Sequence, residues 1–79
     1  GMPIVAFAGA DDGVKVSARA SRSLTDRGLD LSQIMKDAAA SVGGMGGGHS
    51  VAAGATIPEG KEESFLEEVD KLVAAQLCG

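Results

Sequence analysis

The feature that most constrains this chain is a run of glycines near its middle. Residues 43–48 hold five glycines and one methionine, and His49 follows them directly. Glycine loses more backbone entropy on folding than any other residue, so a small domain needs a backbone reason to keep five together. The run predicts either several positive φ angles or a very close approach of another group to the main chain. A loop of exposed N–H groups would also form a nest for an anion.

Two phosphate-binding motifs and a flexible linker are alternative explanations of the run. The stretch from Gly43 to Ser50 nearly matches the P-loop pattern, but His49 stands where the motif has lysine. A helix is expected before the run and a strand after it, which reverses the P-loop order, and no G-x-G-x-x-G motif is present. A linker between two halves remains an alternative, although linkers usually have polar flanks.

The N-terminal third has the pattern of a β-hairpin. Residues 3–8 are apolar and include β-forming side chains, and residues 9–13 contain an Asp-Gly turn signal. Residues 14–21 alternate apolar and polar side chains, which predicts a strand with one buried and one polar face. Residues 22–29 are polar and are expected to form a loop.

A short amphipathic helix is expected over residues 31–42, where apolar side chains recur at helical spacing. Asp30 is a suitable N-cap, and Gln33 stands three residues later as a capping-box partner. Gly43 is suited to end the helix in a left-handed conformation.

The C-terminal part predicts one more strand and one more helix. Residues 51–57 are small and apolar, as in a strand, and residues 61–77 have a helical period with Phe65 on the apolar side. The expected order is β-β-α-Gly loop-β-α. This is an α/β (α+β) fold with a small single sheet of three or more strands and helices packed on it.

Size and charge limit the classes of function. Seventy-nine residues allow one domain, expected over residues 2–79 with Gly1 as the remnant of a cleaved tag. The net charge of −4 comes from residues 58–79, which hold six acids and two bases, whereas residues 1–57 are neutral. This balance argues against strong non-specific binding to long polyanions but allows a local basic site. A single cysteine, Cys78, excludes an internal disulfide, and a cytoplasmic protein without a membrane span is expected.

Polar side chains on the alternating strand suggest a binding site. Ser17 and Arg19 stand on one face, roughly 7 Å apart, and arginine is suited to bidentate phosphate recognition. An ordinary solvated sheet face is the alternative. His49 could donate to a phosphate, but the chain has no second His or nearby Cys with which to bind a metal. No paired carboxylates or nucleophile–base arrangement indicate an enzyme in this chain by itself.

Two motifs together resemble a known family. The string Gly46-Gly47-Gly48-His49 followed by Ala52-Ala53-Gly54 resembles the GGGH-x-x-AAG signature of the DHH-associated C-terminal domain. The strand Val16–Ser21 resembles that domain's S-x-R-S strand with one residue inserted. The family includes RecJ-type exonucleases, nano-RNases and pAp phosphatases, and a related variant with GGGR ends alanyl-tRNA synthetase-like proteins.

The resemblance implies a substrate-binding module rather than a complete enzyme. Ser17, Arg19, Gly46, Gly47, Gly48 and His49 would grip the phosphates of a single-stranded nucleic acid, a short oligonucleotide or a nucleotide. A separate DHH domain, which in this family holds manganese or another divalent metal, would hydrolyse the phosphoester. No cofactor is expected in this chain. A structural or oligomerisation module, as in a homodimer, is the alternative function.

Overall fold

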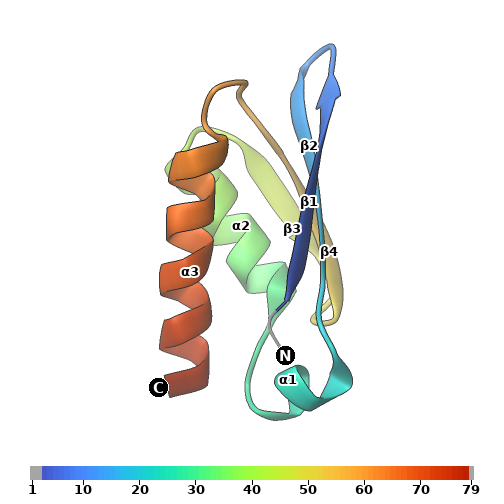
Figure 1. Cartoon of the computed structure of the whole chain (residues 1–79), viewed down its shortest axis with the longest axis vertical. Coiled ribbons are helices and arrows are strands. Elements are labelled where there is room, and N and C mark those ends of the chain that lie inside the picture. The colour runs from blue at the N-terminus through green and yellow to red at the C-terminus, as the bar shows by residue number, and fades with distance from the viewer. Residues whose placement is uncertain (1–2, 79) are drawn as a thin grey trace.

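The structure is a four-stranded antiparallel sheet with two long helices on one face and a short helix at one end (Figure 1). It is a computed structural model that describes residues 3–78, so the expectation about Gly1 lies outside the described residues. The elements are β1 (Ile4–Ala10), β2 (Gly13–Arg19), α1 (Arg22–Asp26), α2 (Leu31–Ser41), β3 (Met45–Gly48), β4 (Ala52–Ile57) and α3 (Glu62–Cys78). The predicted fold class is confirmed.

The sheet has the strand order β1-β2-β4-β3, so β1 and β3 form its two edges. β1 and β2 form the expected hairpin, in which Ala10 pairs with Gly13 across a two-residue turn. The alternation along β2 is also confirmed, because Val14, Val16 and Ala18 are buried while the side chains between them are exposed.

The core lies between the helices and one face of the sheet. α2 supplies five buried side chains at the predicted helical spacing, and α3 adds Phe65, Val69 and Val73. The Phe65 ring is fully buried and meets Phe7 of β1 edge to face, with ring centroids 6.2 Å apart. The opposite face of the sheet carries no helix (Figure 1).

The expectation that residues 43–48 form a loop is wrong, because Met45–Gly48 is the edge strand β3. It pairs with β4 from Met45 opposite Thr56 to Gly48 opposite Ala53. Within the glycine run, only Gly43 and Gly44 end the helix, as predicted for Gly43. Gly43, at φ +84°, and Gly44 donate their N–H groups to the last turn of α2, as in a Schellman motif.

Two local expectations are also corrected. Residues 22–29 contain the helix α1, which Ser21 caps by accepting from the Leu24 N–H. Asp30 caps α2 as predicted, but Gln33 is not its capping-box partner, because the Gln33 amide donates to Asp37 instead. The Asp30 N–H donates to the Gln76 side chain of α3 at 2.7 Å, so the second half of the cap comes from another helix.

Candidate functional site

The helix-free face of the sheet brings part of the predicted site together. Residues directly opposite each other in a sheet point to the same face, and Ser17 lies opposite Gly54, which lies opposite Gly47. Arg19 lies opposite Ala52 in the next row. A shallow hollow of about 340 Å³ is lined by Ser17, Ala18, Arg19, Gly47, Gly48, Ala52, Ala53 and Gly54.

The glycines of β3 are present for different reasons. A Cβ atom at Gly46 would lie 2.8 Å from the Met35 carbonyl carbon and closer still to its oxygen, so α2 packs directly on this backbone. At Gly48, φ is +141° and a Cβ would lie 2.6 Å from Ala53 Cα. A Cβ at Gly47 would meet nothing within 4 Å, because this residue faces the open hollow. Packing therefore explains Gly46 and Gly48 but leaves Gly47 unexplained.

The six predicted site residues do not all line the hollow. Ser17, Arg19, Gly47 and Gly48 do, whereas the Cα of Gly46 faces α2 on the other side of the sheet. His49 is exposed and follows Gly48, outside the set that lines the hollow. Their roles in binding stay predictions.

Backbone hydrogen bonds hold the turn around His49 in place. The His49 N–H donates to the Ala52 carbonyl at 2.8 Å, which extends the β3–β4 ladder by one pair. The next two carbonyls accept bonds from other elements, from Leu31 to Ser50 at 3.1 Å and from Ala20 to Val51 at 3.0 Å. The turn is thus tied both to the start of α2 and to the end of β2.

Alternation along the ladder also determines where the free backbone donors lie. In an antiparallel pair, successive residues point their N–H and C=O groups to opposite sides of the strand. Because the His49 N–H points toward β4, the N–H groups of Gly48 and Gly46 point to the free edge of β3. Gly46 therefore offers a donor at the sheet edge although its Cα faces the helix.

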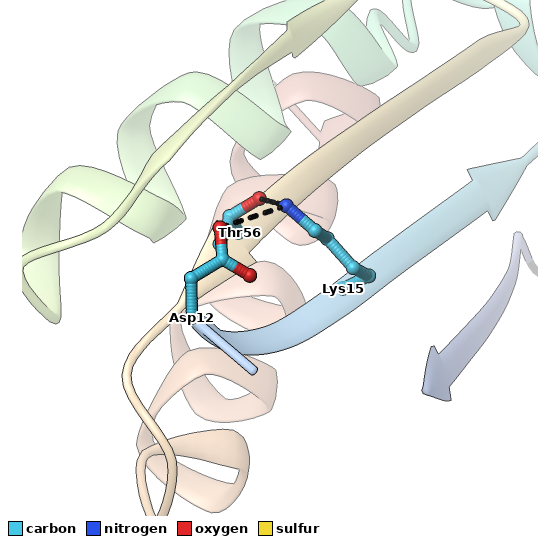
Figure 2. A network of polar contacts seen from close by, with 3 residues as sticks. All are labelled: Asp12, Lys15 and Thr56. Carbon is cyan, nitrogen blue, oxygen red and sulfur yellow. Dashed lines mark hydrogen bonds and ion pairs between the residues drawn. The ribbon is translucent and has the colours of Figure 1, made fainter. Parts of the chain in front are cut away.

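The cations on the open face differ in their surroundings. Lys15 donates to Thr56 Oγ1 at 3.0 Å and lies 3.4 Å from Asp12 Oδ2, and Figure 2 shows its amine reaching both of these side chains. Among the residues from 3 to 78, Arg19 makes no ion pair. Its guanidinium is therefore the cation available to an anion in the hollow.

The acidic residues of the C-terminal segment do not oppose this site. Residues 62–70 belong to α3, on the face of the sheet opposite to the hollow (Figure 1). Among residues 3–78, no acidic side chain lines the hollow. A larger hollow of about 450 Å³, at the other end of β3 and β4, is lined by Asp12 and by no basic side chain, which makes it unsuitable for a phosphate.

The described residues do not fit a metal site. Within residues 3–78, no group of three or more His, Cys, Asp or Glu side chains is close enough to hold a metal ion. Over the same range, none of the helices combines the length and apolarity needed to cross a membrane.

Sequence reasoning missed the contribution of β4 to the hollow. Ala52 and Gly54 line it because β4 lies between β2 and β3, and this strand order is not readable from the sequence. A glycine inside a predicted strand was the available signal, since it marks a bulge or a close backbone approach.

Comparisons with known proteins identify the family of this chain. Residues 1–75 match the DHHA1 domain family. An uncharacterized protein of Methanocaldococcus jannaschii is 43% identical over 75 residues, a stretch that covers 95% of this chain and 17% of that protein. The chain thus spans about a sixth of this curated relative.

Two solved structures share the fold. One is a DHH-domain structure described as a member of the s1p family of ribosomal proteins, with 35% identity and a TM-score of 0.66 over 90% of this chain and 16% of that one. The other is the C-Ala domain of Aquifex aeolicus alanyl-tRNA synthetase, with a TM-score of 0.69 over 95% of this chain and 65% of that one. At 16% identity, the second shows a common fold alone. The resemblance carried by residues 46–54 is confirmed, and the chain belongs to the DHHA1 domain family.

Proposed function

We propose that this chain binds the phosphate groups of a single-stranded nucleic acid, a short oligonucleotide or a nucleotide, and presents them to a separate DHH domain. DHHA1 domains accompany DHH catalytic domains, and the chain spans only 17% of its curated relative. The DHH domain would carry the manganese or other divalent metal and perform the phosphoester hydrolysis. The present chain would contribute binding and orientation of the substrate.

One observation carries the proposal. The Arg19 guanidinium, which makes no ion pair among the described residues, lies beside a hollow in which Gly47 and Gly54 expose their backbone. Gly47 has open space where its side chain would be, and Gly54 lies opposite it. A phosphate, or the sugar next to it, can therefore approach the main chain closely. Ser17 offers a hydroxyl on the same face, two residues from Arg19.

The electrostatics of the two faces support the same assignment. Arg19 stands on the open face, where Lys15 is already paired with Asp12, and the acidic α3 lies on the other face of the sheet (Figure 1). The chain is acidic as a whole, so long polyanions are repelled at a distance. The terminal phosphate of a short ligand can instead enter the hollow, where it meets the positive charge of Arg19. This distribution of charge favours binding to the end of a nucleic acid over binding along a long strand.

The proposal is tested by measuring the affinity for a short 5′-phosphorylated single-stranded oligonucleotide. Arg19→Ala should weaken binding by about 1–3 kcal/mol, because a charge-assisted hydrogen bond to phosphate is lost. Arg22→Ala is the matched control, since Arg22 is an exposed arginine on α1 outside the hollow. Equal affinities of the two variants would refute Arg19 as a contact. They would favour a structural role for this face.

A further inference from the structure

Within the part of the chain that the structure describes, no strand pairs with the outer edge of β1. β1 is the first strand of the order β1-β2-β4-β3, so one of its sides faces away from the sheet. In the described range 3–78, the backbone hydrogen bonds outside the ladders and helices involve no residue of this strand. α2 and α3 lie on one face of the sheet and leave this edge open (Figure 1).

The register of the strands and one hydrogen bond identify the free backbone groups on this edge. The Ala20 N–H donates to the Val51 carbonyl, so even-numbered residues of β2 point their backbone groups toward β4. Odd-numbered residues of β2 then point toward β1, where they pair with the even-numbered residues of β1. The N–H and C=O groups of Val5, Phe7 and Gly9 therefore point outward, away from the sheet.

Between Ile4 and Ala10 this edge lacks the features that normally prevent strands from pairing edge to edge, and Pro3 stands just before the strand. Natural edges carry lysines, prolines or bulges, or are very short. The β1 sequence from Ile4 to Ala10 has seven residues, no charge and no proline, and its register with β2 is unbroken. Ile4 is 72% exposed and Phe7 is 37% exposed, so apolar side chains also stand beside the free backbone.

We propose that β1 pairs in antiparallel fashion with β1 of a second copy of this chain, about a two-fold axis through Phe7, and so forms a continuous eight-stranded sheet. This register places Phe7 opposite the partner's Phe7 and Val5 opposite the partner's Gly9. All of these residues have outward backbone groups, so each pair exchanges two hydrogen bonds. The edge is thus complementary to itself, as a two-fold interface requires.

Charge complementarity at both ends of the strand pair favours a second copy over another partner. The pairing brings Asp11 of one turn toward the partner's Ile4, whose neighbour on β2 is the exposed Arg19, whereas Asp12 is turned toward Lys15. The two-fold axis repeats this approach at the other end. β1 itself carries no charged residue, so no like charges face each other across the axis. Both helix-free faces would lie on the same side of the joined sheet, so the two hollows would share one surface.

Sedimentation velocity over about 10 μM to 1 mM tests the proposal, since an interface of one strand pair is small and its dimer depends on concentration. Gly9→Pro removes an outward N–H at two places per dimer and should weaken association about tenfold or more. Gly9→Ala is the matched control, because it keeps the N–H and its Cβ meets nothing within 4 Å. Circular dichroism of each variant confirms the fold.

A charge pair tests the register independently of the proline. Ala6 and the partner's Ala8 face each other in this register, on the open face. The double variant Ala6→Glu/Ala8→Glu should dimerise more weakly than the parent, whereas Ala6→Lys/Ala8→Glu should dimerise at least as well. Two results would overturn the proposal. One is a chain that stays monomeric throughout the range, and the other is a dimer that neither Gly9→Pro nor the charge pair alters.

Discussion

Alanine at Gly46 and alanine at Gly47 should affect the fold in opposite ways, although the two glycines are neighbours in β3. At Gly46 the new Cβ would lie 3.1 Å from the Ala55 Cβ and 2.8 Å from the carbonyl carbon of Met35. Met35 is fully buried in α2, so the helix backbone must move away from the sheet. At Gly47 the new Cβ would meet nothing within 4 Å.

The magnitudes follow from these distances. Overpacking a well-packed contact costs about 1–3 kcal/mol, and the opposing atoms at Gly46 are backbone atoms of Met35 and the Cβ of Ala55, which cannot change rotamer. For a domain of this size, each kcal/mol shifts the melting temperature by about 4–8 °C. Gly46→Ala should therefore lower it by roughly 5–20 °C. Gly47→Ala should leave it unchanged or raise it slightly, because Gly47 has no positive φ and alanine reduces the entropy of the unfolded chain.

Thermal unfolding followed by circular dichroism measures both effects on the same instrument. Equal melting temperatures for Gly46→Ala and the parent would refute the argument that α2 requires glycine in β3. The second half of the test is binding. Gly47→Val should keep the fold but abolish binding of the phosphorylated oligonucleotide, since a branched side chain fills the hollow. A folded Gly47→Val variant with normal affinity would exclude a close backbone approach of the ligand.

Three further variants test the account of the fold. Phe65→Ala should cost about 3–5 kcal/mol in urea unfolding, because the ring is fully buried. Gln76→Ala should cost about 0.5–1.5 kcal/mol by freeing the Asp30 N–H. The Ser32 hydroxyl and backbone N–H groups hold the pKa of Asp30 below its ordinary 3.8. Its stabilisation is therefore complete above pH 3.8 and lost as pH falls through the lowered pKa. Asp30→Asn should flatten that part of the acid-unfolding curve.

The elements with strong local patterns could be predicted from the sequence. Side chains return to the buried face every second residue in a strand and about every 3.6 residues in a helix. The apolar residues of β2, α2 and α3 show these periods, so the elements can be predicted from the sequence. Gly43 was recognised because a left-handed residue after a helix favours glycine. The Asp-Gly signal predicts the hairpin, although its two turn residues are Asp11 and Asp12 and Gly13 already begins β2.

The missed elements depend on contacts that are distant in sequence. β3 is nearly all glycine and carries no hydrophobic period, so its strand conformation comes from pairing with β4 and from the approach of α2. Gln76, 46 residues from Asp30, completes the cap that the local pattern assigned to Gln33. α1 has only five residues and one buried side chain, Leu24, which is too short for a period to appear.

The candidate site was predicted in its residue types but not in its arrangement. Ser17 and Arg19 share a face because of strand alternation, which the sequence reveals. The strand order decides that Gly47 and Gly54 lie beside them and that Gly46 faces the helix. Chain order places β3 before β4, but the sheet places β4 next to β2, and nothing local encodes that choice.

Binding of phosphate by the helix-free face can be measured by an NMR titration of the isotope-labelled chain. The ligand is a short single-stranded oligonucleotide with a 5′-phosphate, and its dephosphorylated form is the control. We expect shifts confined to the amides of Ser17, Arg19 and Gly46–His49, and much smaller ones without the phosphate. Shifts of equal size with both ligands, or shifts elsewhere on the chain, would contradict the account.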